Sequence, residues 1–247
     1  MRLDVFFAPN QVKPADTAGR LVIIVDVLRA STTVATALGN GAKTVIPLEG
    51  PDDVITRSKE FARSQTLLAG EQKMHPITGF DLGNSPQAFT PEVVEGKTIL
   101  LTTTNGTHAL LGVQGARDIV VASYVNFTAV LAMMKVAASS NTDIAIICAG
   151  EEGSFTLEDA ACAGRYVRAI PKRAALAVND AAAASVLIEK KYGDNIAKVF
   201  KESTHGQALQ SAGFGDDLAA AAEVDSYPVV PIWQDRQITK LGPERAR

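Results

Sequence analysis

Short aliphatic runs alternate with longer alanine-rich stretches along the chain, and this alternation limits the fold more than any other feature of the sequence. The runs have the length of buried strands, and the stretches between them carry apolar residues at helical spacing. This rhythm predicts a three-layer α/β/α sandwich with a central mixed, largely parallel sheet. Because no Ser/Gly-rich linker or internal repeat divides the chain, residues 1–247 are predicted to form a single domain.

The predicted elements follow the same rhythm. Strands are expected at Arg2–Phe7, Leu21–Val25, Thr44–Pro47, Thr66–Ala69, Thr98–Thr102, Asp118–Val121 and Asp143–Cys148. Helices are expected at Ser31–Leu38, Pro51–Ser64, Gly106–Leu111, Phe127–Ser139, Leu157–Ala169, Asp180–Tyr192, Asn195–Glu202 and Asp216–Glu223. The stretch YPVVPIW is predicted to be a loop, and the charged tail after Arg236 is predicted to fray.

Composition argues against several classes of protein. The net charge of −3 provides no basic field for a phosphate backbone, so nucleic acid is not expected as a partner. No apolar run reaches the roughly 18 residues of a membrane span, and the N-terminal residues do not match a signal peptide. Cys148 and Cys162 lie in apolar surroundings without CxxC spacing, which favours reduced thiols and a cytoplasmic location.

The segment VIIVDVLRASTT places polar residues at the end of a predicted buried strand. Ligands of open α/β sheets bind outside the carboxyl ends of strands, where Asp26 would lie. Arg29 offers a planar fork to an oxyanion, and Ser31 and Thr32 lie at a helix N-terminus, which stabilises anions. On this segment alone, a turn aspartate, a surface arginine and an N-cap serine are an equally good interpretation.

Two further segments contain short polar side chains in loops. In TTTNGT, an anion-cradling loop and ordinary strand, turn and cap chemistry are both consistent with the residues. In GFDLGNSP, the side chains could reach a ligand, although Asn-Ser-Pro is also common in turns. The candidate residues are Thr103, Thr104, Asn105 and Gly106 in the first loop and Asn84 and Ser85 in the second.

Carboxylates follow several of the predicted strands. Asp26, Glu71 and the pair Glu158 and Asp159 could converge at one edge of the sheet. First-turn carboxylates also suit a helix dipole, which explains at least one of the pair without a ligand. The chain has three histidines, none at metal-ligand spacing, so a hard oxygen site for Mg²⁺ is favoured over zinc.

Spacing argues against other familiar phosphate chemistries. Ser154 stands where a cysteine phosphatase would have its arginine after Cys148, and Leu28 stands where a haloacid-dehalogenase enzyme would have its second aspartate. Ala42 interrupts the only stretch that approaches a P-loop, so ATP is not indicated. We favour a buried structural role for Cys148, because no nearby histidine is evident to lower its pKa.

Five segments in order, VDVLRASTT, LAGE, GFDLGNSP, TTTNGT and AGEEGSFTLEDAACAG, resemble the 2-phosphosulfolactate phosphatase family, with a match from about Phe6 to Trp233. The resemblance implies Mg²⁺-dependent phosphatases with an α/β/α fold. It also implies hydrolysis of 2-phosphosulfolactate to 3-sulfolactate and phosphate in coenzyme M biosynthesis. Each segment alone is only moderately specific, whereas five in order are strong evidence.

Together these features lead to a hypothesis for the site. Asp26, Arg29, Glu158 and Asp159 would carry the chemistry, with Mg²⁺ held by Asp26, Glu71 and one or both of the paired carboxylates. Asp26 would act as a nucleophile or as a metal ligand beside an attacking water. Arg29, Ser31, Thr32 and the loop 103–106 would hold the phosphoryl group, while Asn84 and Ser85 would meet the carboxylate or sulfonate.

Two other functions remain open at this stage. The chain could be a phosphatase or phosphotransferase for another small phosphorylated acid, or a non-catalytic protein that binds an anionic metabolite. The carboxylates argue against the second, because acidic side chains repel an anion unless a metal intervenes. We expect a small phosphorylated acid as the substrate and no membrane partner, and the alanine-rich helices leave ample surface for a homodimer.

Overall fold

The computed structural model describes residues 1–171 and 177–242, with residue 108 described by its backbone alone. Within these residues, eleven strands form one sheet in the order β5-β4-β6-β3-β11-β10-β7-β2-β8-β1-β9. The strands are β1 (Arg2–Phe6), β2 (Leu21–Val25), β3 (Thr44–Pro47), β4 (Thr66–Gln72), β5 (His75–Pro76), β6 (Thr98–Thr102), β7 (Asp118–Ala122), β8 (Ile144–Cys148), β9 (Ala177–Val178), β10 (Pro231–Gln234) and β11 (Gln237–Lys240).

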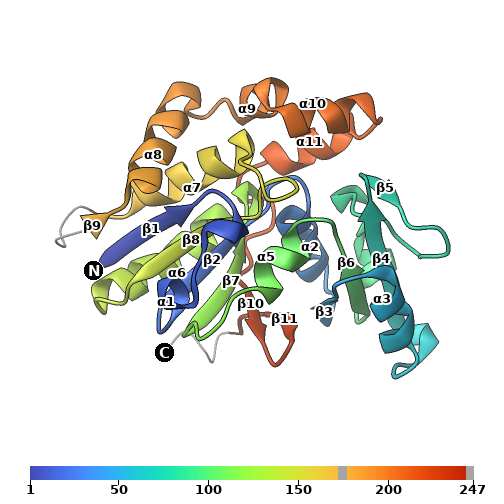
Figure 1. Cartoon of the computed structure of the whole chain (residues 1–247). Helices are drawn as coiled ribbons and strands as arrows, with labels where there is room; N and C mark the ends of the chain where they lie inside the picture. The colour runs from blue at the N-terminus through green and yellow to red at the C-terminus, as the bar shows by residue number, and fades with distance from the viewer. Residues whose placement is uncertain (172–176, 243–247) are drawn as a thin grey trace.

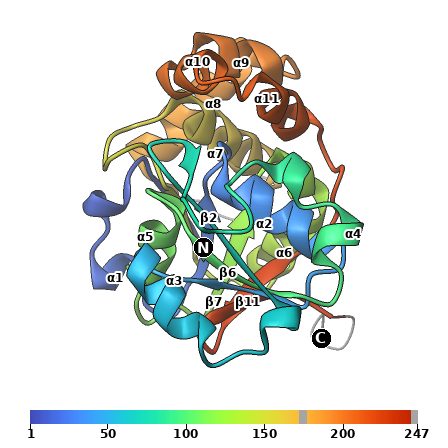
Figure 2. The ribbon, with the colours of Figure 1, turned by 90° about the vertical axis from the view of Figure 1, so that its right-hand side faces the viewer.

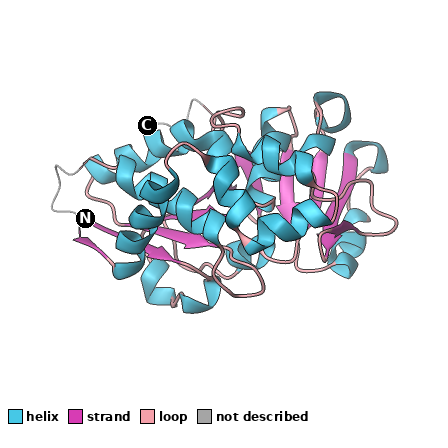
Figure 3. Cartoon of the chain, turned by 90° about the horizontal axis from the view of Figure 1, so that it is seen from above, coloured by secondary structure: helices cyan, strands magenta, loops and turns pink. Residues whose placement is uncertain are grey.

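Helices cover both faces of this sheet, which confirms the predicted three-layer α/β/α sandwich with a mixed, largely parallel sheet (Figure 3). None of the helices in the described part of the chain is long and apolar enough to cross a membrane. The helices are α1 (Pro14–Thr17), α2 (Ala30–Gly39), α3 (Pro51–Ser58), α4 (Pro91–Val94), α5 (Gly106–Leu111), α6 (Phe127–Ser139), α7 (Leu157–Ala169), α8 (Asp180–Tyr192), α9 (Ile196–Glu202), α10 (Thr204–Ser211) and α11 (Gly215–Ala222).

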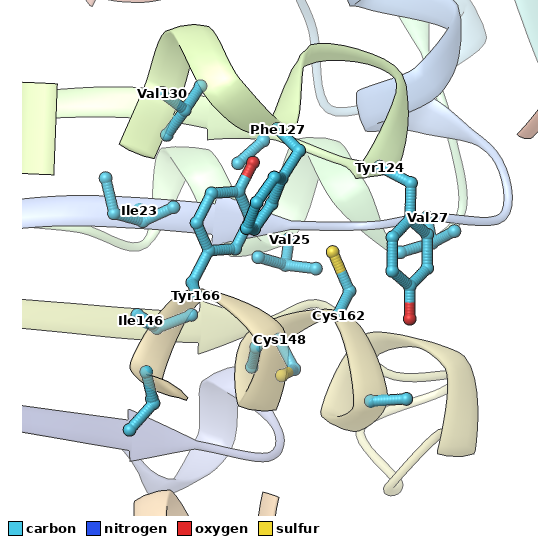
Figure 4. Packing of buried hydrophobic residues seen from close by; sticks show 14 of the residues in the cluster. Ile23, Val25, Val27, Tyr124, Phe127, Val130, Ile146, Cys148, Cys162 and Tyr166 are labelled. Atoms are coloured by element: carbon cyan, nitrogen blue, oxygen red, sulfur yellow. The ribbon is translucent and has the colours of Figure 1, made fainter. Parts of the chain in front are cut away.

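The side chains of β2 alternate between two hydrophobic cores, as the period of a strand requires. Ile23 and Val25 face the core formed with α6, α7 and α8, where Phe127 and Tyr166 pack beside them (Figure 4). Val22 and Ile24 face the core formed with α2 and α5. All five residues of β2 are buried, which explains why its sequence is a continuous aliphatic run.

The C-terminal elements differ from the prediction. Part of YPVVPIW forms β10, and the tail after Arg236 continues as β11 in the middle of the sheet; residues 243–247 lie outside the described residues. Pro231 is tolerated because it is the first residue of its strand. Asp235 and Arg236 form the connecting turn with φ of 52° and 60°. Asp is common at the first of these positions, but Arg236 replaces the glycine usual at the second, so the sequence lacks the full hairpin signal.

Two helix predictions also needed correction. The helix predicted at Pro51–Ser64 ends at Ser58, and a short 3-10 helix at Arg63–Gln65 leads into β4 instead. In addition, α10 has no predicted counterpart. Its N-cap Ser203 accepts a hydrogen bond from the Gly206 amide, a local signal that short helices share with ordinary turns.

The hairpin of β10 and β11 divides the sheet into two parallel halves, with β4, β6 and β3 on one side and β7, β2, β8, β1 and β9 on the other. Twist adds roughly 20–25° at each step, so the four steps from β3 to β2 accumulate to roughly 90°. In Figure 1 the first set accordingly stands upright, while β1, β2 and β8 run across the view. Three antiparallel pairings between β3 and β7 make the two halves run in opposite senses before this twist. The loops after β6 and β2 nonetheless meet, where Gly106 approaches Asp26.

Residues 195–222, which we call the cap, contain α9, α10 and α11 and lie together at the top of the molecule (Figures 1 and 2). The cap is part of the larger hydrophobic core, to which it contributes Val199, Phe200 and Leu209. The Phe200 ring lies 6.3 Å from the Tyr124 ring, centroid to centroid. Because these contacts are apolar and buried, they fix the cap over the strand ends.

Candidate active site

Asp26 lies directly after β2, at the position that the sequence predicts, and it is 5% exposed. Its Oδ1 accepts a hydrogen bond from the Ala30 amide at 3.1 Å, and its own amide donates to Ser31 Oγ at 2.9 Å. The loop between β2 and α2 therefore turns around this aspartate. Since Ala30 is the first residue of α2, the carboxylate also satisfies one of the helix's unpaired N–H groups.

The loop after β6 closes on Asp26 from the other half of the sheet. A Cβ atom at Gly106 would lie 2.6 Å from Asp26 Oδ2 and 2.7 Å from Ala30 Cβ, so only glycine allows this approach. The rest of the loop is held by internal bonds, because Thr103 Oγ1 accepts from the Thr107 amide. Asn105 Oδ1 accepts a hydrogen bond from the Glu152 amide at 2.9 Å, which ties this loop to the loop after β8.

Glu71, on β4, reaches the same region from the small parallel half. Its Oε1 accepts hydrogen bonds from the Thr104 amide at 2.8 Å and from Thr104 Oγ1 at 2.9 Å. Its Oε2 accepts from the Met74 amide at 2.9 Å. Both carboxylate oxygens are therefore engaged with the neighbouring loop and with the turn that leads to β5.

Asp159 and Glu158 lie in the first turn of α7, and both are buried. Asp159 Oδ1 accepts from the Val27 amide at 2.8 Å, and its Oδ2 accepts from the Gly150 amide at 3.1 Å. Gly150 has a φ of 64°, a conformation that suits glycine and directs its N–H to this carboxylate. Glu158 differs, because its Oε2 is buried without a hydrogen-bond partner among the described residues.

These carboxylates influence one another's ionisation. The pKa of Asp26 is raised to about 6, mainly by burial and also by the negative charges of Glu71 and Glu158, against the opposing influence of His205 and the Ala30 amide. Burial also raises the pKa of Asp159 well above its usual range, with additional repulsion from Asp26 and Glu158. The site is thus an environment in which several negative charges are costly without a cation.

His205, in α10 of the cap, faces this acidic group. Its Nδ1 lies 3.1 Å from Glu158 Oε1, and the side chain is 9% exposed. Burial alone would lower the pKa of His205, but the Glu158 hydrogen bond and the negative charges of Glu158, Glu151 and Asp26 outweigh it and raise the pKa to about 9. A protonated His205 therefore supplies positive charge at the site at neutral pH.

Arg29 is held by residues that are distant in the sequence. Its Nη1 donates to Asp217 Oδ2 at 2.7 Å, and its Nη2 donates to the Met74 carbonyl at 2.7 Å. The Phe214 ring lies over the guanidinium, 4.3 Å from Cζ to the ring centroid. Arg29 is thus a buried residue with protein partners, and the surface cation considered from the sequence is excluded.

The remaining candidate side chains lie close by. Thr32 Oγ1 donates to the Val27 carbonyl and pairs with Ser123 Oγ, each at 2.7 Å, so its hydroxyl already has partners. Ser85 Oγ donates to Asp217 Oδ1 at 2.5 Å. Asn84 is 5% exposed, and its Oδ1 is buried without a partner among the described residues.

Cys148 lies at the end of β8 and is 1% exposed, with Cys162 and Tyr166 in the same core (Figure 4). Burial raises the pKa of its thiol well above the usual range, and the negative charges of Asp159 and Glu158 raise it further. Both cysteines are free and buried. A protonated, inaccessible thiol fits the structural role favoured from the sequence.

A small apolar cavity of about 20 Å³ lies beside the site, lined by Ile24, Val34 and Leu101 together with Ser31, Gly106 and Thr107. It has the volume of about one water molecule. The cavity is therefore too small for a phosphorylated acid, and it reflects packing behind the loops that follow β2 and β6.

Within the described residues, no group of three or more His, Cys, Asp or Glu side chains is arranged to hold a metal ion as it stands. The four carboxylates nonetheless belong to one electrostatic group. Two of them, Glu71 and Asp159, have both oxygens engaged by hydrogen-bond donors. The freer oxygens belong to Asp26 and Glu158.

Comparison with known proteins identifies the family. The model of the 2-phosphosulpholactate phosphatase family matches residues 6–236. The chain belongs to this family. Among its relatives, a protein of Caldanaerobacter subterraneus subsp. tengcongensis is 37% identical over 231 residues, which cover 94% of this chain and 95% of the relative. A protein of Symbiobacterium thermophilum is 38% identical over 236 residues, covering 93% and 98%. A Clostridium acetobutylicum protein is 31% identical over 239 residues, covering 96% and 100%.

Each of these three relatives is named "probable 2-phosphosulfolactate phosphatase". The matched region of the 2-phosphosulpholactate phosphatase family spans every carboxylate of the candidate site and the whole cap. The resemblance inferred from the five segments is therefore confirmed, and it extends slightly beyond Trp233.

Three residues of this family member's site were missed from the sequence: His205, Phe214 and Asp217. All three lie in the cap, outside the five segments that carried the resemblance. The one available signal was the scarcity of histidine, since a chain with three histidines offers few general acids or cations of this type. Residue type alone, however, does not place His205 beside Glu158.

Proposed function

We propose that this protein is a Mg²⁺-dependent phosphatase that hydrolyses 2-phosphosulfolactate to 3-sulfolactate and phosphate. The observation that carries the proposal is the meeting of buried carboxylates from both halves of the sheet around Asp26, in a chain of this family. We further propose that it acts in the cytoplasm, where its two thiols would stay reduced, and in coenzyme M biosynthesis.

The balance of charge supports a requirement for a cation. Five buried carboxyl groups surround the site, while Arg29 and His205 are the cations that contact them within the described part of the chain. An anionic substrate would add further negative charge to this group. The five carboxyl groups are those of Asp26, Glu71, Glu158, Asp159 and Asp217.

The donor set fits Mg²⁺, which prefers oxygen ligands and keeps several waters. Asp26 and Glu158 would hold the ion, because Glu158 Oε2 has no partner among the described residues and the Ala30 amide engages only the Oδ1 atom of Asp26. Glu71 and Asp159 would complete the acidic environment and orient the loops through their hydrogen bonds. When bound, Mg²⁺ would supply a Lewis acid for a phosphoryl oxygen and offset the carboxylate charge.

Asp26 would take part directly in the hydrolysis, either as the nucleophile or as the base that activates water. In the first route, an Asp26 oxygen attacks phosphorus, the ester P–O bond breaks, and the leaving alkoxide takes a proton; water then hydrolyses the aspartyl phosphate. In the other, water attacks phosphorus directly and Asp26 accepts a proton from that water, while the ester P–O bond breaks and the leaving alkoxide takes a proton from solvent. Quenching a single turnover with hydroxylamine, followed by mass spectrometry of the peptide that contains Asp26, distinguishes the two routes, because only a covalent aspartyl phosphate gives the hydroxamate.

Substrate binding is assigned to the loops around Asp26. Arg29, Ser31 and the loop 103–106 would hold the phosphoryl group, with Thr32 supporting the loop through Val27. Asn84 and Ser85 would meet the second acidic group of the substrate, and the unpaired Asn84 Oδ1 is consistent with a ligand or water at that position.

The test is phosphate release from 2-phosphosulfolactate, phospholactate and phosphoglycolate, each with Mg²⁺ and with EDTA. Release that is selective for the sulfonated compound and lost in EDTA is expected. Phosphate release from only the other two compounds would exclude 2-phosphosulfolactate as the substrate but would still support phosphomonoester hydrolysis as the reaction. Equal release in EDTA would reject the metal requirement, and binding without release would favour a non-catalytic protein.

A further inference from the structure

Asp217 joins two segments to which the proposed function assigns the substrate. Its Oδ2 accepts a hydrogen bond from Arg29 Nη1, and its Oδ1 accepts one from Ser85 Oγ. The side chains of Asp217 and Arg29 are each 3% exposed, so this ion pair is shielded from solvent. A single carboxylate in the cap therefore links the loop after β2 to the loop before the 3-10 helix at Pro86–Ala88.

The contacts around Arg29 fix the plane of its guanidinium. Asp217 holds Nη1, and the Met74 carbonyl holds Nη2. Phe214 covers one face of the group. Because a guanidinium is planar, two hydrogen bonds at its edge and one ring on its face leave it little freedom to rotate.

The Met74 contact is itself part of the site. Glu71 Oε2 accepts a hydrogen bond from the Met74 amide, while the Met74 carbonyl accepts one from Arg29 Nη2. The orientation of Arg29 is thus set from the strand side through Glu71 and from the cap side through Asp217. Asp217 supplies the only charged acceptor of Arg29 among the described residues, which makes its hydrogen bond the stronger of the two.

Arg29 keeps donors for a ligand in this arrangement. Among the described residues, two of its five N–H groups have acceptors. Without Asp217, the guanidinium would be a buried cation without a counter-charge and would leave this position for solvent or another carboxylate. The remaining N–H groups would then lose the direction in which they can meet an oxyanion.

We propose that Asp217 is a positioning residue, which holds Arg29 and Ser85 in the orientation that receives the anionic substrate. This inference rests on the proposed function in one respect, namely that Arg29 and Ser85 bind the substrate. Asp217 itself does not touch the substrate, because both of its oxygens are already occupied. Its effect is therefore on binding more than on the chemical step.

The main test compares Asp217→Asn with Asp216→Asn. Asp216 is the exposed neighbour in the same helix, so its substitution removes the same charge without touching Arg29. Asp217→Asn is expected to raise KM for 2-phosphosulfolactate at least tenfold, and to weaken binding of inorganic phosphate in calorimetry by a similar factor. For this variant kcat is expected to change less than threefold, and Asp216→Asn is expected to stay within twofold of wild type throughout.

Two further variants separate positioning from folding and from charge. Asp217→Glu keeps the charge and moves the carboxylate by one methylene, so positioning predicts weakened phosphate binding in a protein with a normal melting temperature. In an Arg29→Lys background, Asp217→Asn is expected to add less than a twofold change, because the planar fork that Asp217 holds is already absent.

Each outcome has a separate meaning. Unchanged KM and phosphate affinity in Asp217→Asn and Asp217→Glu, with only a lower melting temperature, would reduce Asp217 to a structural residue. Tighter phosphate binding would mean that Asp217 competes with the anion for Arg29, which also overturns the inference. If the wild type binds phosphate but does not hydrolyse the substrate, the binding comparison still decides the role of Asp217 while the proposed function fails. If the wild type binds no phosphate at all, Arg29 is not an anion site and the inference fails.

Discussion

The strand ends and the cap contribute to the same site by different means. On the strand side, Asp26 and Asp159 are held by backbone amides of neighbouring loops. In the cap, His205 and Asp217 are held by side-chain partners, Glu158 and Arg29. The strand side of the site is thus built by local backbone geometry, whereas the site residues of the cap depend on charged pairs formed between elements that are distant in the sequence.

This difference suggests a division of roles. A carboxylate that an amide holds through one oxygen, as Asp26 is held, keeps a fixed position, which suits a group that reacts or holds a metal. An ion pair can be broken or reoriented by an anionic ligand that competes with its carboxylate for the cation. Such pairs therefore suit groups that recognise an anion. Substitutions on the strand side should therefore abolish the reaction, and substitutions in the cap should weaken binding or change its dependence on pH.

Asp26→Asn is the substitution with the largest expected effect. Asparagine keeps the shape and can still accept the Ala30 amide, but it lacks the charge for attack, proton transfer or metal binding. We expect kcat for 2-phosphosulfolactate to fall by ~10³-fold or more. Phosphate release measured with saturating Mg²⁺ tests this, with Asp52→Asn, an exposed carboxylate of α3, as the matched control.

The stability of Asp26→Asn should move in the opposite direction. Because the folded-state pKa of Asp26 is raised to about 6, the wild type loses stability as pH rises from about 4 through 6. Above pH 6 in EDTA, the neutral variant should be more stable by about 3 kcal/mol, the shift of about two pKa units converted to free energy. A variant that unfolds more easily than wild type at pH 7 would contradict the burial of an unneutralised carboxylate.

His205→Gln is expected to have the next largest effect, and it tests the cap. The folded-state pKa of about 9 lies above the ordinary 6.5, so the stabilisation is complete below pH 6.5 and is lost as pH rises through 9. At pH 6 the variant should be less stable than wild type by about 3 kcal/mol, and the two should converge above pH 9. Urea unfolding at several pH values measures this, in EDTA.

The control for this prediction is His75→Gln, because His75 is an exposed histidine outside the acidic group. It should follow the wild-type pH dependence. If the unfolding free energy of His205→Gln also changes with pH as that of wild type does between pH 6 and 9, then His205 carries no additional proton in the folded protein. In that case the cap does not supply positive charge to Glu158.

The same comparison explains what could be predicted from the sequence. Asp26 follows one continuous aliphatic run, and Glu158 and Asp159 lie in the first turn of the helix that follows a second run. Their convergence follows from the rule that ligand-binding residues gather at the carboxyl ends of strands. Gly106 was identified as well, although no sequence pattern indicated that Asp26 would be its neighbour. Local patterns are sufficient where the backbone itself forms the site.

The rest depended on tertiary structure. The turn between β10 and β11 has Arg236, a residue that rarely takes positive φ, where glycine is usual. The sequence therefore did not indicate this hairpin or the junction of the two half-sheets. His205 and Asp217 lie on short helices where their spacing has no chemical meaning until the cap folds over the strand ends. The partners that define them, Glu158 and Arg29, are distant in sequence.

Cys148→Ala should have the smallest effect, and it tests whether the strand side contains any reactive group besides its carboxylates. The thiol lies at the carboxyl end of β8, next in the sheet to the strand that precedes Asp26, but it is buried and its pKa is raised. We expect kcat and KM within twofold of wild type. Removing the sulfur from a packed core should lower stability by about 1–2 kcal/mol.

A loss of activity much larger than this loss of stability would mean that the thiolate takes part in the reaction. Comparing phosphate release with unfolding free energy for Cys148→Ala distinguishes the two, and Cys162→Ala provides the control, since that thiol lies in the same core within α7. Equal, small effects in both variants would leave phosphoryl transfer to the amide-held carboxylates. A location at the end of a strand, such as that of Cys148, would then be insufficient for a side chain to react. The side chain must also face the cap and be able to ionise.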